Sequence, residues 1–328
     1  MTPEKISVTI TPLKKVLVDS SSTNLQVLVR IAARTEKPLR KAPLSVALVI
    51  DRSGSMRGAR LESAKTAAKL FVDALDHDDE VCIVAYDDEV KVPLPLTSVS
   101  GFRPLLPEIL SSIDSGGSTD LHAGWLEGAQ QLAPKSNGSK MCRVVLLSDG
   151  KANRGLQNVQ QICDQVSQLA RAGITTTTVG IGLDFNEHLM TEMALAGQGS
   201  AMYGDRAEDL VEPLEAEVGL LKSLAWHAVS FQIHGDFANW TVHNPYACLE
   251  PGIWQLPSLA NQSEAWVALS IPMTSAITAQ LESQGKTALQ ITINARDAEG
   301  KLHQVQAELS NLEVVSATDY EHSPENEL

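Results

Sequence analysis

The chain has 328 residues, of which 43% are hydrophobic, and its formal net charge is −14 at pH 7. This length leaves room for two domains with real hydrophobic cores. The acidic balance argues against nucleic acid as a partner, because its recognition usually needs a basic face, and it disfavours anionic membrane surfaces. No stretch is long and apolar enough to span a bilayer, so we expect no membrane insertion.

The first 43 residues predict two strands. Polar and apolar residues alternate over 5–10 and 24–33, and a polar segment at 19–22 predicts a turn between them. Alternation of this kind is typical of a strand with one face buried and one in water. We therefore expect residues 1–43 to belong to an antiparallel sheet.

From residue 44 to 224 the pattern changes to alternating strands and helices. Buried strands are predicted from apolar runs at 44–50, 81–86, 141–147 and 174–181, with a short strand at 201–203. Helices are predicted from apolar stripes within 61–75, 105–113, 121–132, 159–170, 187–196 and 207–224. A strand at 89–96 contains Pro93 and Pro95, which places it at a sheet edge. The alternation predicts a doubly wound α/β domain with a mostly parallel sheet.

After residue 224 no strong helical stripe appears. Short strands are predicted at 226–234, 252–256, 265–271, 287–295 and 302–309. Together with the strands of residues 1–43, those of residues 225–313 would form one antiparallel β-sandwich built from both chain ends, with the α/β domain 44–224 inserted in it. The acidic segment 314–328 shows no apolar pattern, and we predict that it is disordered.

Two of the predicted buried strands end in carboxylates. The run 46–50 leads into Asp51, which is followed by Ser53 and Ser55, and the run 143–147 leads into Ser148 and Asp149. Between them lies a Gly-Gly-Ser-Thr-Asp loop that contains Thr119. Oxygen ligands of this kind suit Mg²⁺, which takes one or two carboxylates and several waters in an octahedron. Taken singly, serines and aspartates at strand ends more often cap helices.

The order Asp-x-Ser-x-Ser, Gly-Gly-Ser-Thr-Asp and Ser-Asp-Gly, each at a predicted strand-to-helix loop, resembles the von Willebrand factor A domain family over roughly residues 44–224. The resemblance implies a Rossmann-like fold with a metal-ion-dependent adhesion site (MIDAS). The matching ligand positions, all intact here, are Asp51, Ser53, Ser55, Thr119 and Asp149. The implied cofactor is Mg²⁺, with Mn²⁺ or Ca²⁺ as alternatives. If the strand order is the doubly wound one, Asp51 and Asp149 end neighbouring strands.

The resemblance also implies a function without bond-making chemistry. In the family, hydroxyls bind the cation directly and the carboxylates often act through water, so that an Asp or Glu of a partner protein can complete the octahedron. The segments 44–56 and 175–186 are similar to soluble bacterial-type members, some of which act as adaptors with AAA-type ATPases. We therefore expect an adaptor or scaffold with no catalytic residues. Arg57, Lys151 and Arg154 lie in or just after the site loops and are either aids to partner binding or ordinary solvated charges.

Two other functions stay open. A Mg²⁺-dependent hydrolase would need a general base, and Asp120 and His122 are the nearest candidates in the sequence. A secreted adhesin is the second alternative. The segment 1–5 lacks the apolar core of a signal peptide, and the four cysteines show no Cys-x-x-Cys spacing, so we expect a cytoplasmic location. A mature secreted chain would look the same at its N-terminus.

Overall fold

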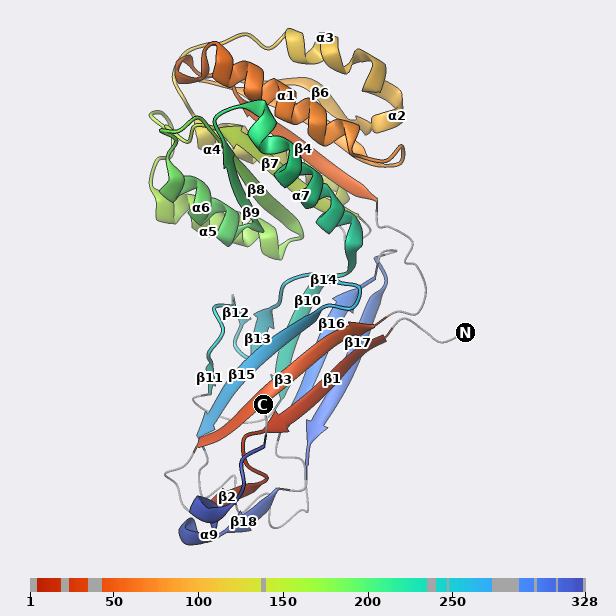
Figure 1. Ribbon diagram of the computed structural model, residues 1–328, viewed down its shortest axis with the longest axis vertical. Coiled ribbons are helices and arrows are strands. Elements are labelled where there is room, and N and C mark those ends of the chain that lie inside the picture. The colour runs from red at the N-terminus through yellow and green to blue at the C-terminus, as the bar shows by residue number, and fades with distance from the viewer. Residues whose placement is uncertain are drawn as a thin grey trace. The chain divides into compact units, whose positions relative to one another are not determined.

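The computed structural model of the chain divides into two compact units. One is formed by the middle of the chain up to Ser223, and the other by segments on either side of it (Figure 1). The structure describes residues 5–18, 24–34, 43–136, 140–234, 240–246, 248–272, 289–297, 300–310 and 312–326. The turn predicted at 19–22 lies outside these residues. Within these ranges, no helix combines the length and hydrophobicity needed to cross a membrane.

The described residues of the middle unit form a six-stranded sheet. In spatial order its strands are β6 (Val90–Ser98), β5 (Glu80–Tyr86), β4 (Leu44–Asp51), β7 (Met141–Ser148), β8 (Ile174–Ile181) and β9 (Gln198–Gly204). All neighbours are parallel except β5 and β6. The strand order reverses between β4 and β7, which confirms that these two strands are neighbours.

The sequence explains the place of each kind of strand. Every residue of β4 and β7 is buried, because helices cover both faces of the sheet, and both strands therefore read as continuous apolar runs. The edge strand β6 contains Pro93 and Pro95, which cannot donate to a hydrogen-bond ladder. Its position at the sheet edge confirms the prediction from the two prolines.

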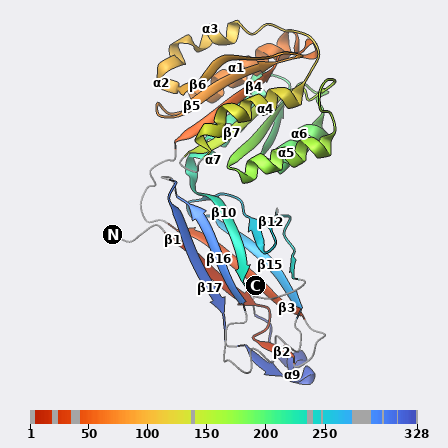
Figure 2. The same cartoon turned by 180° about the vertical axis from the view of Figure 1, so that it is seen from behind.

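Helices lie on both faces of this sheet (Figures 1 and 2). One face shares a core with α4 (Leu121–Leu132), α5 (Val159–Arg171) and α6 (Glu187–Ala196). The other face carries α1 (Ala59–Asp73) and α7 (Val211–Ser223). Shorter helices are α2 (Val99–Phe102) and α3 (Leu106–Ser111), and 3₁₀ turns occur at η1 (Gly54–Met56), η2 (Arg103–Leu105), η3 (Ala133–Lys135) and η4 (Ala207–Leu210).

The helix predicted over 207–224 differs in its first turn. Residues 207–210 form the 3₁₀ turn η4, and the α-helix begins only at Val211. Pro213 then lies in the first turn of α7, where a backbone N–H has no partner inside the helix anyway. The proline therefore marks the start of the helix and not a kink within it.

In the flanking unit, the described residues form two antiparallel sheets that share one hydrophobic core. The first sheet has the order β1 (Lys5–Pro12), β3 (Asn24–Arg34), β15 (Glu264–Pro272) and β11 (Thr241–Val242). The second has the order β12 (Cys248–Glu250), β13 (Ile253–Gln255), β10 (Leu224–His234), β16 (Leu289–Arg296) and β17 (Leu302–Leu309), and β14 (Leu259–Ala260) also pairs with β10. Because β3 pairs with β15, segments from both ends of the chain build one sheet. The predicted fold class is confirmed.

The prediction that the segment 314–328 is disordered was wrong for its described residues, 314–326. The strand β18 (Glu313–Val315) pairs in parallel with β2 (Val16–Val18), and the short helix α9 (Ala317–His322) follows it. The ammonium of Lys14 donates to the carbonyl of Tyr320 at 3.0 Å, and the N–H of Asn326 donates to the carbonyl of Leu13 at 2.8 Å. The pairing uses backbone groups of a distant segment, which a polar composition does not reveal.

Candidate metal centre

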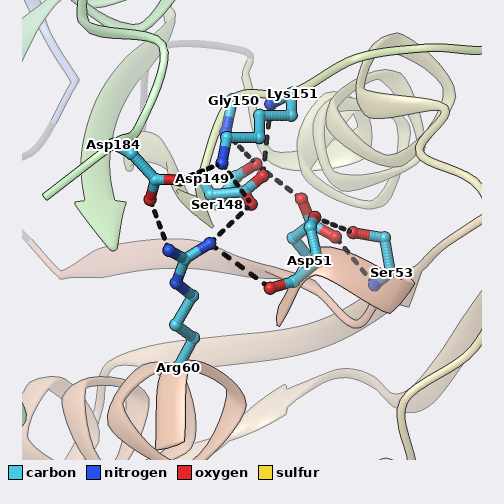
Figure 3. A network of polar contacts seen from close by, with 9 residues as sticks. Asp51, Ser53, Arg60, Ser148, Asp149, Gly150, Lys151 and Asp184 are labelled. Carbon is cyan, nitrogen blue, oxygen red and sulfur yellow. Dashed lines mark hydrogen bonds and ion pairs between the residues drawn. The ribbon is translucent and has the colours of Figure 1, made fainter. Parts of the chain in front are cut away.

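The site predicted from the sequence lies at the carboxyl ends of β4 and β7. Asp51 is the last residue of β4, Asp149 follows directly after β7, and the register pairs Ile50 with Leu147. Both carboxylate side chains are fully buried. Ligands of open α/β sheets bind at this edge, where the strand order reverses. The structure therefore places both carboxylates where the motif requires them (Figure 3).

The first loop brings two hydroxyls beside Asp51. The N–H of Ser53 donates to Asp51 Oδ1 at 2.9 Å, and the hydroxyls of Ser53 and Ser55 are 3.2 Å apart. Ser53 is buried, whereas Ser55, in the 3₁₀ turn η1, is exposed. The pair of hydroxyls thus leads from the buried carboxylate toward solvent.

Ser148 links the ends of the two strands. Its hydroxyl donates to Asp51 Oδ2 at 2.6 Å and accepts from the N–H of Gly150 at 2.8 Å. These bonds fix the orientation of the Asp51 carboxylate. Ser148 was not among the predicted site residues. Its place directly before Asp149, at the end of a strand, could have indicated that it belongs to the site.

Asp149 is held by backbone and by cations. The N–H of Lys151 donates to Asp149 Oδ1 at 3.2 Å, and Arg60 Nη1 of helix α1 lies 3.4 Å from Asp149 Oδ2. Arg60 also forms an ion pair with Asp184, to which Lys151 Nζ donates at 2.6 Å. Figure 3 shows Arg60 between the two aspartates. Arg60 and Asp184 are residues that the sequence analysis missed.

Asp184 belongs to a fourth loop, residues 182–186, which follows β8. The N–H of Asn186 in this loop donates to the carbonyl of Asp149 at 2.9 Å. At Gly182 the backbone has φ +87°, and a Cβ there would lie 2.8 Å from Arg60 Nε. Only glycine allows this conformation without strain, and only glycine leaves room for the guanidinium.

The second loop is joined to the third through Thr119. Its N–H donates to Asn153 Oδ1 at 2.9 Å, and its carbonyl accepts from the N–H groups of Asn153 and Arg154, both at 3.1 Å. The side chain of Thr119 is buried. The structure therefore fixes Thr119 against the loop that carries Asp149.

A buried ion pair holds the glycines that precede Thr119. Arg52 Nη2 donates to Asp87 Oδ1 at 2.7 Å, and Asp87 Oδ2 accepts from the N–H of Gly117 at 3.0 Å. The N–H of Gly116 donates to the carbonyl of Arg52 at 2.6 Å. A Cβ at Gly116 would lie 1.6 Å from Asp87 Oδ2, so this position must be glycine. We name the pair the Arg52–Asp87 brace; no local pattern predicts it, because the two residues are far apart in the chain.

Asp51 and Asp149 place two carboxylates of like charge close together in a buried site. Burial raises the pKa of Asp51, the hydrogen bonds from Ser148 and Ser53 lower it, and the charge of Asp149 raises it again. Among the described residues, Asp51 has no ion pair, whereas Asp149 has Arg60 and Lys151 nearby. Two buried carboxylates beside hydroxyls offer a donor set of oxygens alone, which fits a hard cation better than Zn²⁺.

A second metal site is not seen in the described residues. They contain no group of three or more His, Cys, Asp or Glu side chains placed to hold a metal, as expected if the donor set includes only two carboxylates. Asp120, one suggested base, accepts from the N–H of Ala123 at 3.0 Å and caps α4. His122, the other, lies 2.8 Å from Gln165 Oε1 through its Nε2 and packs against Trp125. Both residues have structural partners.

Comparisons with known proteins agree with this architecture. The chain is 28% identical to the uncharacterized protein sll0103 of Synechocystis over 179 residues, which are 54% of this chain and 41% of that protein. It is 32% identical to the uncharacterized protein YfbK of Escherichia coli over 195 residues, 58% of this chain and 33% of that protein. The chain thus spans less than half the length of these relatives.

A solved structure of a von Willebrand factor type A protein from Catenulispora acidiphila has the same fold over most of the chain. The TM-score is 0.71 at 17% identity, with 96% of this chain and 75% of that chain covered. The family model described as the von Willebrand factor type A domain matches residues 45–215. The match covers more than half of the chain and includes all four loops at the site, so the chain belongs to the von Willebrand factor type A domain family.

Proposed function

We propose that this protein is an adaptor or scaffold that binds an Asp or Glu side chain of a partner protein through a divalent cation. The ligands that we propose are Asp51, Ser53, Ser55, Thr119 and Asp149. The observation that carries the proposal is the pair of fully buried carboxylates at the ends of two neighbouring strands, next to two adjacent hydroxyls of which Ser53 is buried and Ser55 is exposed. Domains of this family generally act as metal-dependent interaction modules, and most are not enzymes.

The residues around the ligands support this chemistry. Ser148 and the N–H of Ser53 orient the Asp51 carboxylate, and Asn153 fixes the loop of Thr119. We propose Mg²⁺, with Mn²⁺ or Ca²⁺ as alternatives, because the donors are all oxygens. When bound, the cation would supply positive charge at the mouth of an otherwise acidic site. Hydroxyl ligands are neutral and leave that charge available to a partner carboxylate.

Calorimetric titration of the full chain with Mg²⁺ and Mn²⁺ tests the metal site. We expect one site in the wild type and none in Asp51→Ala or Asp149→Ala. The matched control is Asp73→Asn, which removes an exposed carboxylate at the end of α1 and should bind metal normally. Absence of binding at millimolar metal, or equal binding in all variants, contradicts the proposal.

An affinity pulldown tests the partner. Wild type and Asp51→Ala are compared in Mg²⁺ and in EDTA, and we expect a protein that is retained only by the wild type in Mg²⁺. An AAA-type ATPase in that fraction would support the adaptor role, whereas a cell-surface protein would support the adhesin alternative. A hydrolase would instead show metal-dependent turnover of phosphoester substrates that both Asp51→Ala and Asp149→Ala abolish.

A cytoplasmic location is part of the proposal. All four cysteines are free, and Cys82, Cys142 and Cys163 are buried. Burial raises the pKa of the Cys82 and Cys142 thiols to about 12, so these groups stay unreactive thiols. Free cysteines of this kind are usual in a reducing compartment. Fractionation of the native cells tests the location, and recovery outside the cell would favour the adhesin.

A further inference from the structure

An exposed apolar side chain lies on the loop that completes the site. Leu183 is 81% exposed, the largest value for any large hydrophobic side chain in the described ranges. A single exposed leucine needs no explanation by itself. Leu183 differs because it lies in the fourth loop, directly before Asp184, which is bound to both Arg60 and Lys151.

The backbone on both sides of Leu183 is fixed. The N–H of Gly182 donates to the carbonyl of Gly204 at 3.0 Å, and Asp184 is held by its two ion pairs. The residues on either side therefore position the backbone of Leu183. The structure holds the leucine in solvent beside the site.

The same loop also carries an aromatic side chain that contacts the neighbouring strand. The ring of Phe185, two residues after Leu183, stacks on the ring of Tyr203 with centroids 5.7 Å apart and an interplanar angle of 19°. Tyr203, on β9, is itself 65% exposed. Leu183 and Tyr203 together form what we call the apolar rim.

Cations border the same site in a chain whose net charge is −14. Arg60 and Lys151 share Asp184, and Arg154 pairs with Asp88 at 3.2 Å. Arg57 is exposed, its Nε lies 3.4 Å from the hydroxyl of Ser115, and it forms no ion pair with the described residues. Arg57 is therefore an exposed cation without a carboxylate partner among the described residues, and it would attract an acidic group of a partner.

We infer that the partner segment combines acidic and apolar side chains. One carboxylate would bind the proposed cation, a second would lie against Arg57, and an apolar side chain would cover the apolar rim. The inference rests on the proposed function and adds to it the chemistry of the partner. It excludes a small dicarboxylate as the natural ligand, because such a molecule has nothing to place on Leu183.

Selection from a random linear peptide library on the full chain tests the inference. Peptides are bound in Mg²⁺ and released with EDTA. We expect the released peptides to be enriched in two acidic residues close to a Leu, Phe or Tyr. Released peptides with acidic residues but no apolar preference overturn the inference and leave the proposed function standing. If EDTA releases no peptides, the proposed function fails as well.

Variants test the apolar rim directly, with a selected peptide as the probe. Leu183→Ser should weaken binding about tenfold, the effect of losing most of one buried leucine contact. The matched control is Leu195→Ser, because Leu195 is 73% exposed but lies near the opposite end of α6. Equal affinities for wild type and Leu183→Ser, with binding still abolished by EDTA, overturn the inference alone.

The contribution of Arg57 is tested separately, by the rate at which the peptide associates. Arg57→Gln should slow association at low salt, and the difference from wild type should fade as salt is added, because exposed charges are screened. Arg171→Gln, at the exposed last residue of α5, is the control for loss of one positive charge. If the two variants associate at the same rate, Arg57 does not contact the partner's second carboxylate and that part of the inference is wrong.

Discussion

Strand β7 has a buried charged cluster at each end, and the two clusters differ in their balance of charge. Near its start, Arg143 pairs with Glu217 of α7 at 3.3 Å and donates to the hydroxyl of Thr177 at 2.8 Å. That hydroxyl and the hydroxyl of Ser200 donate to the Glu217 carboxylate at 2.6 and 2.8 Å. Burial lowers the pKa of Arg143, and the nearby charge of Glu217 raises it, so Glu217 favours the charged form of the buried guanidinium.

At its other end, β7 leads to two carboxylates of the same sign. Asp51 is bound by hydroxyl and backbone donors but, within the described residues, by no cation. In the first cluster the positive and negative charges balance, and the ion pair contributes to the stability of the fold. The second leaves negative charge that a cation from outside can neutralise. A buried charge therefore serves stability where the fold supplies a partner of opposite charge, and binding where it does not.

The largest effect on stability should come from removing one partner of the Arg143–Glu217 ion pair. Glu217→Ala leaves the Arg143 guanidinium buried without its carboxylate, and we expect a loss of about 3–5 kcal/mol in the free energy of unfolding. Urea unfolding of the full chain measures it. The double variant Arg143→Met with Glu217→Leu should recover most of the loss, since an apolar pair of similar volume replaces the ions. A Glu217→Ala protein as stable as wild type would show that the cluster is already solvated.

The stability contributed by the second cluster, Asp51 and Asp149, should instead depend on bound metal. At about a hundred times its dissociation constant, Mg²⁺ should raise the free energy of unfolding by about 2.7 kcal/mol, and EDTA should remove the gain. Because the two clusters lie at opposite ends of β7, Glu217→Ala should keep the same increment. If Mg²⁺ raises the free energy of unfolding of Asp149→Asn as much as that of the wild type, the second cluster is not the metal site.

The Arg52–Asp87 brace lies between these extremes, because it is buried like the first cluster but supports the second. Asp87→Asn should cost about 1–3 kcal/mol, the price of weakening hydrogen bonds to a charged group, and should reduce metal affinity by loosening the loop of Thr119. Calorimetry and urea unfolding measure the two effects, with Asp73→Asn as the exposed control.

The same residue predicts a pH dependence. Burial raises the pKa of Asp87, but the N–H groups of Glu89 and Gly117 and the charge of Arg52 outweigh it and hold the pKa below its usual value. A lowered pKa gives stability that is present above the unfolded-state pKa and is lost as pH falls through the folded-state value. Acid unfolding should therefore be less steep in Asp87→Asn than in wild type, and identical profiles would contradict this.

The smallest effect should have the opposite sign. Asp51→Asn removes one of two like charges from the interior, so the metal-free protein should gain about 0.5–2 kcal/mol while losing its response to Mg²⁺. A gain in stability with a loss of function is the mark of a binding site. An Asp51→Asn protein less stable than wild type in EDTA would show that Asp51 serves the fold, as Glu217 does.

The sequence was sufficient where the signal is local. Continuous apolar runs identified β4 and β7, two prolines identified the edge strand β6, and the motif gave the positions of the two carboxylates. The sequence did not predict contacts between residues that are far apart in the chain. Arg60 and Asp184 are 124 residues apart, and nothing in either neighbourhood indicates the ion pair. The pairing of β18 with β2 was missed for the same reason, since backbone groups of any composition can form it.

The pairing of β3 with β15 has a consequence for the order in which the protein is made. Ala32 of β3 pairs with Glu264 of β15 in the same sheet, so one edge of β3 leaves the ribosome long before the strand that pairs with it is synthesised. At about 5–20 residues per second the delay is roughly 10–50 s. The middle unit, whose strands are all encoded between the two, is complete well before then. A nascent chain of this protein therefore carries a folded α/β unit behind a strand with one unpaired edge, and a chaperone that binds extended segments has time to protect it.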